Sequence, residues 1–472
     1  MALDGSVATL LTIQYNLCLG TLATFGNGRS DVEKIISEVL DYRISGQFCL
    51  TEINHGLNAI NIETSATLQP NGEFLLHTPH PGAAKYMPPT CPFGIPCIAI
   101  ILARLIVDGD DYGIRGFIVK LHDGFKMTPG NLEKPRSIRE SFFENIQRVI
   151  SGTLSMGAVT LPALRIGCYI GTAYSLRRQV LDPSTRTMRP ISSFSTQYIP
   201  LLTSIARTLV FCAFGQEMYE RFVDPSISSP SQKHFVASVF KTTVYRHTAE
   251  IILQLGDRCG AQGLFAAEVR GAAIAEGDIL GISIRFAIDT LRGKVELYEP
   301  KYPDHLIAQH EQSIINELRL SLLQSKDHRS IETERMLLPH CRGVLEAIGH
   351  RWAYEAAVSR GVSQPIIDLF EASLFELDPA WYSENGGISR WEQKSLLLER
   401  ATALYEDLPQ FLKLLDVEDY VTAPIVSKER WEKYVMQLPV FVNDDEPSTT
   451  LLVSHHVDIT SPQNITLSTR IH

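Results

Sequence analysis

The sequence predicts a mainly helical α+β protein in which one small β domain interrupts a series of helices. Three observations support this fold class. Residues 46–130 hold short segments rich in β-branched residues that are separated by turn signals. Most of the remaining chain carries apolar residues at the i, i+3, i+4 spacing of helices. The composition, with 44% hydrophobic and 20% charged residues, is that of a globular chain with a sizeable core.

The helices and strands are expected in four successive regions. Residues 1–45 are helical, residues 46–130 form the β domain, residues 131–300 form a helical bundle, and residues 301–472 form a second helical region with an irregular tail. The expected strands are 48–53, 64–68, 73–77, 96–107 and 113–121. The expected helices are 31–40, 137–180 with a kink at Pro162, 200–223, 231–259, 264–291, 305–325, 330–359, 364–375 and 390–405.

The charge and the apolar runs exclude several classes of protein. A net charge of −10 argues against a nucleic-acid partner, since phosphate contacts need a basic surface. The apolar runs 95–107 and 201–214 each contain an arginine, so no membrane span is expected. The first twenty residues lack the basic start of a signal peptide. Eight cysteines without a Cys-x-x-Cys pair indicate buried thiols in a reducing compartment, and no metal site is predicted.

The entry to the β domain holds the first candidate site. It reads Gly-x-Phe-x-Leu-Thr-Glu-x-x-His-Gly and contains Thr51, Glu52 and Gly56. Thr51 and Glu52 have a structural interpretation as the end of a strand, and Gly56 has one as a turn residue.

Two further candidate sites lie in the helical bundle. Tyr-Ser-x-x-Arg ends at Arg178 and is followed by a Thr-Gln that contains Gln197, and a basic helix end is also favoured by the helix dipole. Cys-Gly-x-x-Gly contains Gly260 and Gly263 and precedes Glu-Gly-Asp, which begins at Glu276. A carboxylate in so apolar a run either lies on the wet face of its helix or has a raised pKa, as a catalytic base does.

In this order, the three motifs resemble those of the acyl-CoA oxidase and acyl-CoA dehydrogenase superfamily over residues 10–295. The resemblance implies FAD as the cofactor and an acyl-CoA thioester as the substrate, in a homodimer or larger homo-oligomer. Glu-Gly-Asp and the helices after residue 300 point to the oxidase branch. The reaction implied is oxidation of the CH–CH group of the acyl chain to a trans-2-enoyl thioester.

The resemblance also implies a role for each candidate residue. Glu276 matches the base that removes the α-proton. Thr51, Glu52 and Gly56 match the strand that contacts the flavin, with Thr51 bonded to its ring. Arg178 matches an arginine that contacts the FAD pyrophosphate, usually across a dimer interface. The remaining matches lie close to the cofactor: Gln197, Gly260 and Gly263.

A cluster of basic residues between 165 and 189 suits the phosphates of FAD or coenzyme A, and its alternative is an exposed basic loop. The cluster consists of Arg165, Arg177, Arg178, Arg186 and Arg189.

The chain departs from the family pattern in several places. The N-terminal helical domain of the family is mostly absent, and the β domain is short, with a missing segment expected at residues 130–131. Tyr86 stands where an aromatic flavin wall, commonly a tryptophan, is expected. These departures suggest a specialised acyl substrate, as in secondary metabolism. The alternative is a non-catalytic remnant of the flavin fold or a helical interaction protein.

The location of the protein is open between two compartments. The family is often peroxisomal, but the final residues, Arg-Ile-His, differ from the Ser-Lys-Leu peroxisomal signal. A soluble protein of the peroxisome or the cytoplasm is therefore expected.

Overall fold

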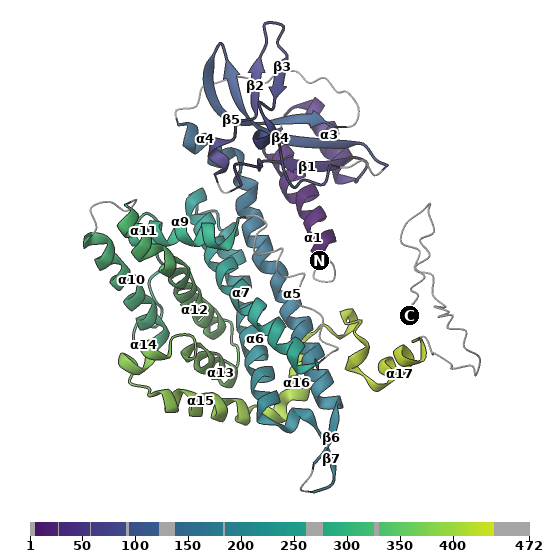
Figure 1. Ribbon diagram of the computed structural model, residues 1–472, viewed down its shortest axis with the longest axis vertical. Helices are drawn as coiled ribbons and strands as arrows, with labels where there is room; N and C mark the ends of the chain where they lie inside the picture. The colour runs from purple at the N-terminus through teal and green to yellow at the C-terminus, as the bar shows by residue number, and fades with distance from the viewer. Residues whose placement is uncertain are drawn as a thin grey trace, which may run out of the picture.

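The structure, a computed structural model, describes residues 5–26, 28–56, 58–90, 94–121, 137–182, 185–260, 277–324 and 330–438. A small β domain lies at one end of a helical bundle, and the long helix α5 (Gln147–Arg177) runs away from it along the bundle (Figure 1). This arrangement confirms the predicted mainly helical α+β fold.

The N-terminal helices are joined to the β domain by one buried glutamine. The side-chain nitrogen of Gln14 donates to the carbonyl oxygens of Val39 (2.9 Å) and Ile44 (3.0 Å), and its oxygen accepts from the backbone N–H of Gly46 (2.6 Å). Gly46 has no room for a side chain, because a Cβ there would lie 2.5 Å from the Cys18 sulfur. The helices of this region are α1 (Gly5–Leu11), a π-helix (Thr12–Leu19), α2 (Gly20–Phe25) and α3 (Ser30–Leu40).

The sheet is built around its strand β4 (Cys97–Val107). Strands β1 (Ser45–Cys49) and β2 (Ser65–Leu68) run parallel to the first and last parts of β4, and β5 (Asp110–Lys120) pairs antiparallel along nearly its whole length. Strand β3 (Phe74–His77) pairs antiparallel with β2. All five predicted strands are therefore present, with ends shifted by at most four residues.

Two turns that the sequence predicts connect these strands. Asp108 and Gly109 both have positive φ (50° and 86°), which suits the two-residue turn between β4 and β5. Gly72 has φ 81° and its N–H donates to the carbonyl of Gln69 at 2.9 Å, which closes the turn between β2 and β3.

One hydrophobic core joins the N-terminal helices to a face of the sheet. Val39 of α3 and Phe48 of β1 both belong to it and are almost fully buried. Its buried members are Leu17, Cys18, Leu22, Val32, Ile35, Val39, Phe48, Ile62, Ile98, Ile100, Leu102, Ile114 and Phe142. The predicted domain boundary at residue 45 therefore runs through a shared core, and it stays a prediction.

Close helix packing forms the bundle. Its first helices are α4 (Ile138–Asn145), α5, α6 (Ser195–Val223), α7 (Pro230–Arg258) and α9 (Ile279–Leu291). Helices α5 and α7 approach closely at Gly157, where an added Cβ would lie 2.8 Å from the Phe240 ring and 3.2 Å from the Lys241 Cα. Helix α5 also continues through Pro162.

The helices after residue 300 pack on the same core as the bundle. The core includes Leu154 of α5 and extends to Ile425, with Trp352 fully buried inside it. The predicted helix 330–359 is wrong in one respect, because it breaks at Pro339, which has no N–H to continue it. The helices are α10 (Leu306–Gln324), α11 (Ile331–Leu337), α12 (Cys341–Ser359), α13 (Gln364–Phe375), α14 (Pro379–Glu384), α15 (Arg390–Ala403), α16 (Leu408–Leu415) and α17 (Lys428–Met436).

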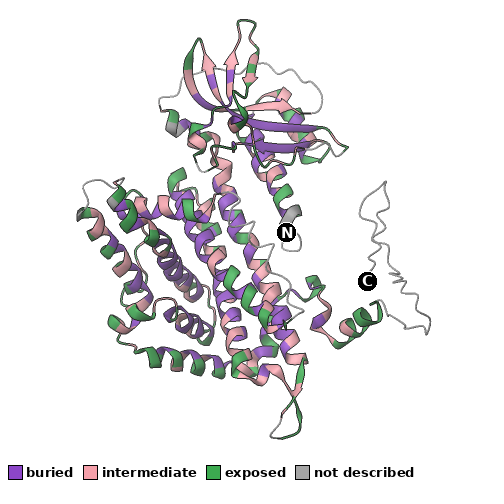
Figure 2. Ribbon diagram, viewed as in Figure 1, coloured by how far each residue is buried: buried purple, intermediate pink, exposed green. Residues whose placement is uncertain are grey.

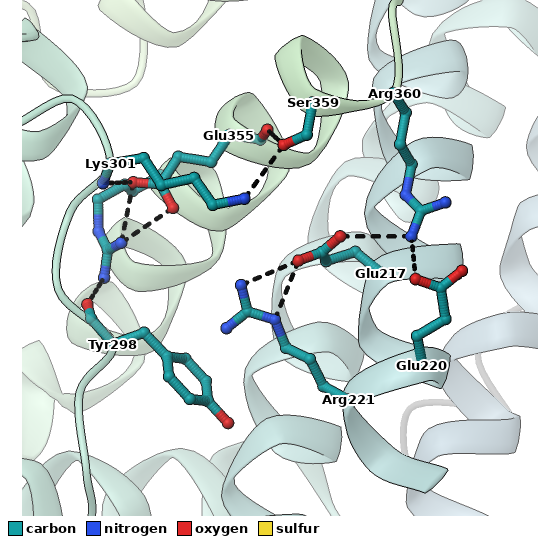
Figure 3. A network of polar contacts seen from close by, with 9 residues as sticks. Glu217, Glu220, Arg221, Tyr298, Lys301, Glu355, Ser359 and Arg360 are labelled. Atoms are coloured by element: carbon teal, nitrogen blue, oxygen red, sulfur yellow. Dashed lines mark hydrogen bonds and ion pairs between the residues drawn. The ribbon is translucent and has the colours of Figure 1, made fainter. Parts of the chain in front are cut away.

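A network of charged residues joins the end of α6 to α12 and to the connection between α9 and α10 (Figure 3). Glu217 of α6 binds Arg221 on its own helix (3.0 Å) and Arg360 after α12 (3.3 Å). Lys301 donates its backbone N–H to Glu355 at 2.9 Å and its ammonium to a serine of α12. These contacts tie the two predicted helical regions together.

Three helices are long and apolar enough to cross a membrane by length and composition: Val7–Phe25, α5 and α6. The shorter apolar runs 95–107 and 201–214 had predicted no membrane span. Of the most apolar window, 61% is buried in α6 and 44% in α5, so much of this surface packs inside the chain (Figure 2). Within α6, buried Arg207 donates to the hydroxyl of Ser373 at 3.0 Å.

Six of the described cysteines are buried, as predicted, and Cys212 is partly exposed. Seven of the eight are described, and each is a free thiol. Burial raises the pKa of Cys18 and Cys168 to about 12, so both stay protonated at neutral pH.

Candidate functional site

Thr51 lies just after β1, beside a segment that contains the predicted aromatic residue. Its carbonyl oxygen accepts a hydrogen bond from the N–H of Tyr86 at 3.1 Å, and Glu52 forms an antiparallel bridge with Lys85. Tyr86 is 58% exposed, and Thr51 is half-buried. Within the described chain, the Thr51 hydroxyl makes no hydrogen bond, so it is available to a ligand.

The carboxylate of Glu52 is used inside the protein. It is fully buried and accepts hydrogen bonds from the Thr64 hydroxyl (2.6 Å) and from the backbone N–H groups of Glu63 and Thr64, and Lys85 pairs with it at 3.0 Å. Burial alone would raise the pKa of Glu52, but these hydrogen bonds lower it overall. Glu52 therefore acts as an ionised anchor for the loop, and a side-chain contact with a cofactor would require it to give up one of these partners.

Gly56 faces open space at the same end of the molecule. A Cβ built on it would meet no described atom within 4 Å, and the residue is exposed. Neighbouring His55 contacts Glu63 at 2.8 Å, and His80 contacts the other carboxylate oxygen of Glu63 at 3.0 Å. The hydrogen bonds from His55 and His80 lower the pKa of Glu63.

A second group of predicted residues gathers at the opposite end of α5. Arg178 follows the last residue of that helix, and its exposed guanidinium has no hydrogen bond or ion pair with another described residue. The side-chain nitrogen of Gln197 donates to the Ser175 hydroxyl (3.1 Å) and to the Arg258 carbonyl (3.2 Å). Gly260 follows the end of α7 with φ 63°, a conformation that favours glycine.

Most of the basic cluster is already engaged. Arg165 donates to the carbonyl of Leu415 at 2.6 Å, and Arg177 donates to the carbonyl of Ile425 at 3.1 Å. Arg189 pairs with an aspartate and lies over an aromatic ring. The predicted phosphate role of the whole cluster is therefore narrowed to two guanidinium groups without a partner in the described chain: Arg178 and Arg186.

The residue after the predicted base lies at the β-domain end of α5. Glu276 and Gly263 fall within residues 261–276, outside the described residues. Gly277 has φ 100°, and a Cβ there would lie 3.8 Å from the hydroxyl of Thr153, near the start of α5. Asp278 caps α9, because its carboxylate accepts from the N–H of Leu280 at 2.9 Å. The predicted helix 264–291 is therefore wrong at residues 277–278, which precede α9.

The predicted residues thus form two groups that a single chain keeps apart. Helix α5 has 31 residues and spans about 46 Å at the rise of an α-helix. Its first turn contacts the N-terminal helices through Arg148 and Asn16 (2.8 Å), whereas Arg178 follows its last turn and leads into the hairpin of β6 (Gln179–Leu181) and β7 (Met188–Pro190) (Figure 1). Thr51, Glu52 and Gly56 therefore lie far from the other group: Arg178, Gln197 and Gly260.

Sequence reasoning missed two lysines beside these groups, of which Lys85 is half-buried and Lys241 is fully buried. Lys85 binds Glu52 and the carbonyl of Leu50 (3.2 Å), and Lys241 of α7 donates to the carbonyl of Gly277 at 2.6 Å. A lysine between Phe240 and two threonines in an otherwise apolar helical segment was the available signal, since an unpartnered lysine is rarely placed there.

The fold is that of a helical-bundle protein with a small β domain. The motifs resemble those of flavoproteins that oxidise acyl-CoA thioesters. No family model matches the chain. It is similar to peroxisomal acyl-coenzyme A oxidase 1 of Arabidopsis thaliana, with 40% identity over 342 residues, covering 59% of this chain and 51% of the relative. The chain spans about half the length of the curated relatives that it matches.

Solved structures share the fold. Acyl-CoA oxidase 1 of Yarrowia lipolytica superposes with a TM-score of 0.77 at 18% identity, over 94% of this chain and 82% of that one. Acyl-CoA oxidase 1 of Caenorhabditis elegans, solved with FAD and ATP, superposes with a TM-score of 0.74 at 19% identity, over 93% and 81%. The chain therefore shares the fold of acyl-CoA oxidases and is similar in sequence to a curated one, in line with the resemblance of its motifs.

Proposed function

We propose that this chain is an FAD-dependent oxidoreductase that converts an acyl-CoA into a trans-2-enoyl thioester. One observation carries the proposal, namely that Thr51 and Gly277 belong to the same end of the molecule. Thr51, whose hydroxyl has no partner among the described residues, belongs to the β domain. Gly277, the neighbour of the expected base Glu276, lies against the part of α5 that adjoins this domain. A base and a flavin-binding residue are required near each other for this reaction.

The residues present fit FAD, but fewer of them have groups available to it than the sequence suggests. Among the described residues, the Thr51 hydroxyl and the Arg178 guanidinium have no partner, and a Cβ on Gly56 or Gly260 would meet no atom within 4 Å. The Arg178 guanidinium would suit a phosphate. Gln197 is engaged between three helices, so its proposed role is to hold the end of the site together. FAD, when bound, supplies the acceptor for the β-hydride.

The chain itself has to supply the base and the support for the thioester. Glu276 is proposed to remove the α-proton, which a desolvated carboxylate with a raised pKa does best. The backbone N–H of Glu276 is proposed to donate to the thioester carbonyl and so to stabilise the charge that develops there. Gly263 is proposed, with Gly260, to let the backbone pass close to the cofactor.

The separation of the two groups supports a homo-oligomer. If Arg178 binds the pyrophosphate of the same FAD that contacts Thr51, the two residues have to come from different copies, since about 46 Å of α5 lies between their groups. A homodimer with two such sites is the simplest arrangement.

The substrate, acceptor and location are proposed at a coarser level. The substrate is an acyl-CoA, and the matched Caenorhabditis elegans acyl-CoA oxidase 2 was solved with FAD, ascaroside-CoA and ATP. Dioxygen is the proposed acceptor, in line with the oxidases among the relatives. Several relatives are named peroxisomal, which supports a peroxisomal protein, with the cytoplasm as the alternative. A role in secondary metabolism is part of the proposal.

A non-catalytic remnant of the flavin fold, acting as a helical interaction protein, is the second candidate. It is favoured by the internal use of Glu52, Gln197 and three of the five arginines in the basic cluster. The visible absorbance spectrum of the purified chain distinguishes the two. Oxidised flavin bands support the enzyme, and their absence after reconstitution with FAD supports the remnant.

The catalytic role is tested with Glu276→Gln. This variant keeps the size of the side chain and removes its basicity, so it should bind FAD and acyl-CoA and reduce its flavin at least ~10²-fold more slowly. Asp278→Asn is the matched control, because Asp278 caps α9 and is expected to affect stability more than this step. Anaerobic stopped-flow bleaching of the flavin measures both. A Glu276→Gln protein that binds the thioester and bleaches at the parent rate would remove Glu276 from the mechanism.

A further inference from the structure

Lys241 is a buried cation for which the proposed reaction has no use. It lies near the middle of α7 and is 0% exposed. An ammonium group loses its hydration when it is buried, and a protein tolerates this only where strong acceptors replace the water. The acceptors of Lys241 therefore indicate why a lysine stands there.

The ammonium of Lys241 donates to the carbonyl oxygen of Gly277 at 2.6 Å. Gly277 is itself constrained, because its φ is 100° and a Cβ would lie 3.1 Å from Ile282. The next residue, Asp278, caps α9, and its carbonyl accepts the N–H of Ile282 at 2.9 Å. Residues 277–278 are thus held by two contacts: Lys241 binds the carbonyl of Gly277, and Asp278 binds the start of α9.

The backbone of Lys241, from which its side chain extends, is also held by helix packing. The Lys241 Cα lies at a close approach of α7 and α5, 3.2 Å from the position of a Cβ on Gly157. One turn earlier on α5, the Thr153 hydroxyl lies 3.8 Å from the position of a Cβ on Gly277. Helix α5 therefore contacts both residues that the Lys241–Gly277 hydrogen bond joins.

We propose that Lys241 is a positioning residue: it holds the backbone of Gly277 at the β-domain end of α5, and through this backbone it positions the base proposed at the next residue, Glu276. The catalytic half of this inference, the positioning of Glu276, rests on the proposed function. The structural half, the holding of Gly277, does not. A charged donor to a carbonyl forms one of the stronger hydrogen bonds in a protein. A general base that shifts by about 1 Å can lose 10²-fold in rate, so a fixed joint next to it has catalytic value.

The structural half is tested by hydrogen exchange in the full-length chain. Lys241→Met removes the ammonium and keeps an apolar side chain of similar length. Exchange of the amides of residues 280–282 should then be faster by about 10- to 100-fold, the factor that corresponds to a lost charged hydrogen bond. Arg207→Met is the matched control, since Arg207 is a buried cation of α6 that binds Ser373 instead. It should leave exchange at residues 280–282 unchanged.

Where Lys241→Met does not give folded protein, Lys241→Leu replaces it with the same expected direction, since leucine also lacks a donor for the Gly277 carbonyl. Unchanged exchange at residues 280–282 in a folded Lys241 variant would overturn the proposal. So would an equal increase in the Arg207→Met control, because the effect would then be a general loss of stability.

The catalytic half is tested by anaerobic flavin reduction in chains that retain FAD. Lys241→Met should lower the limiting reduction rate by about 10- to 100-fold and leave the substrate concentration for half-maximal rate nearly unchanged. Arg207→Met should change neither value. A parent-like limiting rate in Lys241→Met would overturn the positioning role. If the parent chain takes up no FAD, the proposed function fails, whereas the exchange experiment still decides whether Lys241 holds Gly277.

Discussion

A matching residue type contributes to a site only if its functional group is available. Glu52 and Gln197 both match a family motif, yet the carboxylate of Glu52 has four polar contacts within the chain and the amide of Gln197 joins three helices. Thr51 and Arg178 match equally well, and the Thr51 hydroxyl and the Arg178 guanidinium have no hydrogen-bonding partner among the described residues. Sequence reasoning identified all four, but it could not separate them, because the distant partners that occupy the first two are set by tertiary packing.

At the same scale, we expect Arg178→Ala to weaken retention of FAD more than it weakens folding. Loss of a charge-assisted contact with a phosphate costs about 1.5–3 kcal/mol, whereas Arg178 supports no described tertiary contact through its side chain. FAD content after identical gel filtration measures the effect. Arg390→Ala is the matched control, since Arg390 is an exposed arginine at the start of α15 and lies outside the basic cluster. Equal FAD content in both variants and the parent would contradict the assignment.

At the scale of elements, the sequence predicted the helices, strands and turns that depend on residues close together in the chain. The five strands, their two turns and the long helices followed from periodicity, glycine and proline. The break at Pro339 was missed because the apolar pattern continues across it. The start of α9 was also missed, although Asp278 is a good capping residue, because the apolar residues before it suggested a longer helix. The short hairpin of β6 and β7 has too few residues to show a period.

Strand β5 presents an edge that the sequence predicts to be incomplete. Within the described chain its strand partner is β4, and the expected missing segment at residues 130–131 lies outside the described residues. An unpaired edge promotes aggregation. Insertion of a segment of the family's length at that point should therefore raise soluble yield and flavin content, and a glycine–serine insert of equal length should not. If the chain as it stands is soluble, monodisperse and loaded with flavin, this prediction is wrong.

The contact between α7 and α12 contains a pair of buried histidines that should make the fold sensitive to acid. The Nε2 atoms of His247 and His350 lie 2.8 Å apart, which requires at least one neutral ring. Burial, reinforced by nearby arginines that include Arg207 and Arg246, holds the pKa of both well below the usual value of 6.5. The folded chain therefore binds fewer protons than the unfolded chain below pH 6.5, so stability is lost as the pH falls through and below that value.

Each of these histidines should contribute a slope of roughly 1.4 kcal/mol per pH unit below pH 6.5. Chemical denaturation at pH 7, 6 and 5 measures it. His350→Gln should reduce the pH dependence of the free energy of unfolding, even if it lowers stability at pH 7. His77→Gln, at an exposed position in β3, should leave the slope unchanged. An identical slope in His350→Gln and the parent would show that the pair stays protonatable in the fold.

At the scale of the whole molecule, the order of motifs in the sequence does not show their distance in space. Arg178 and the Thr51 group lie at opposite ends of α5, about 46 Å apart along that helix, whereas Gly277 returns to the end where α5 adjoins the β domain. Periodicity predicts that α5 is long. It does not predict that the chain after α7 comes back to the start of α5, because that position depends on how the helices pack. The resemblance to the family supplied the expectation of a shared interface, and the length of α5 supplies a physical reason for it.

This separation allows a test of the whole arrangement by mixing two defective chains. If each FAD is bound by Glu276 and Thr51 of one copy and Arg178 of the other, a dimer of one Arg178→Ala chain and one Glu276→Gln chain has one intact site and one doubly defective site. Random pairing after co-expression should then restore about a quarter of the parent activity at limiting FAD, where each variant alone has little. The assay is oxidation of an accepted acyl-CoA, with separately purified variants combined just before the assay as the control. Activity that never exceeds the average of the two single variants would mean that each site is built within one chain, and the proposed role of Arg178 across the interface would be lost.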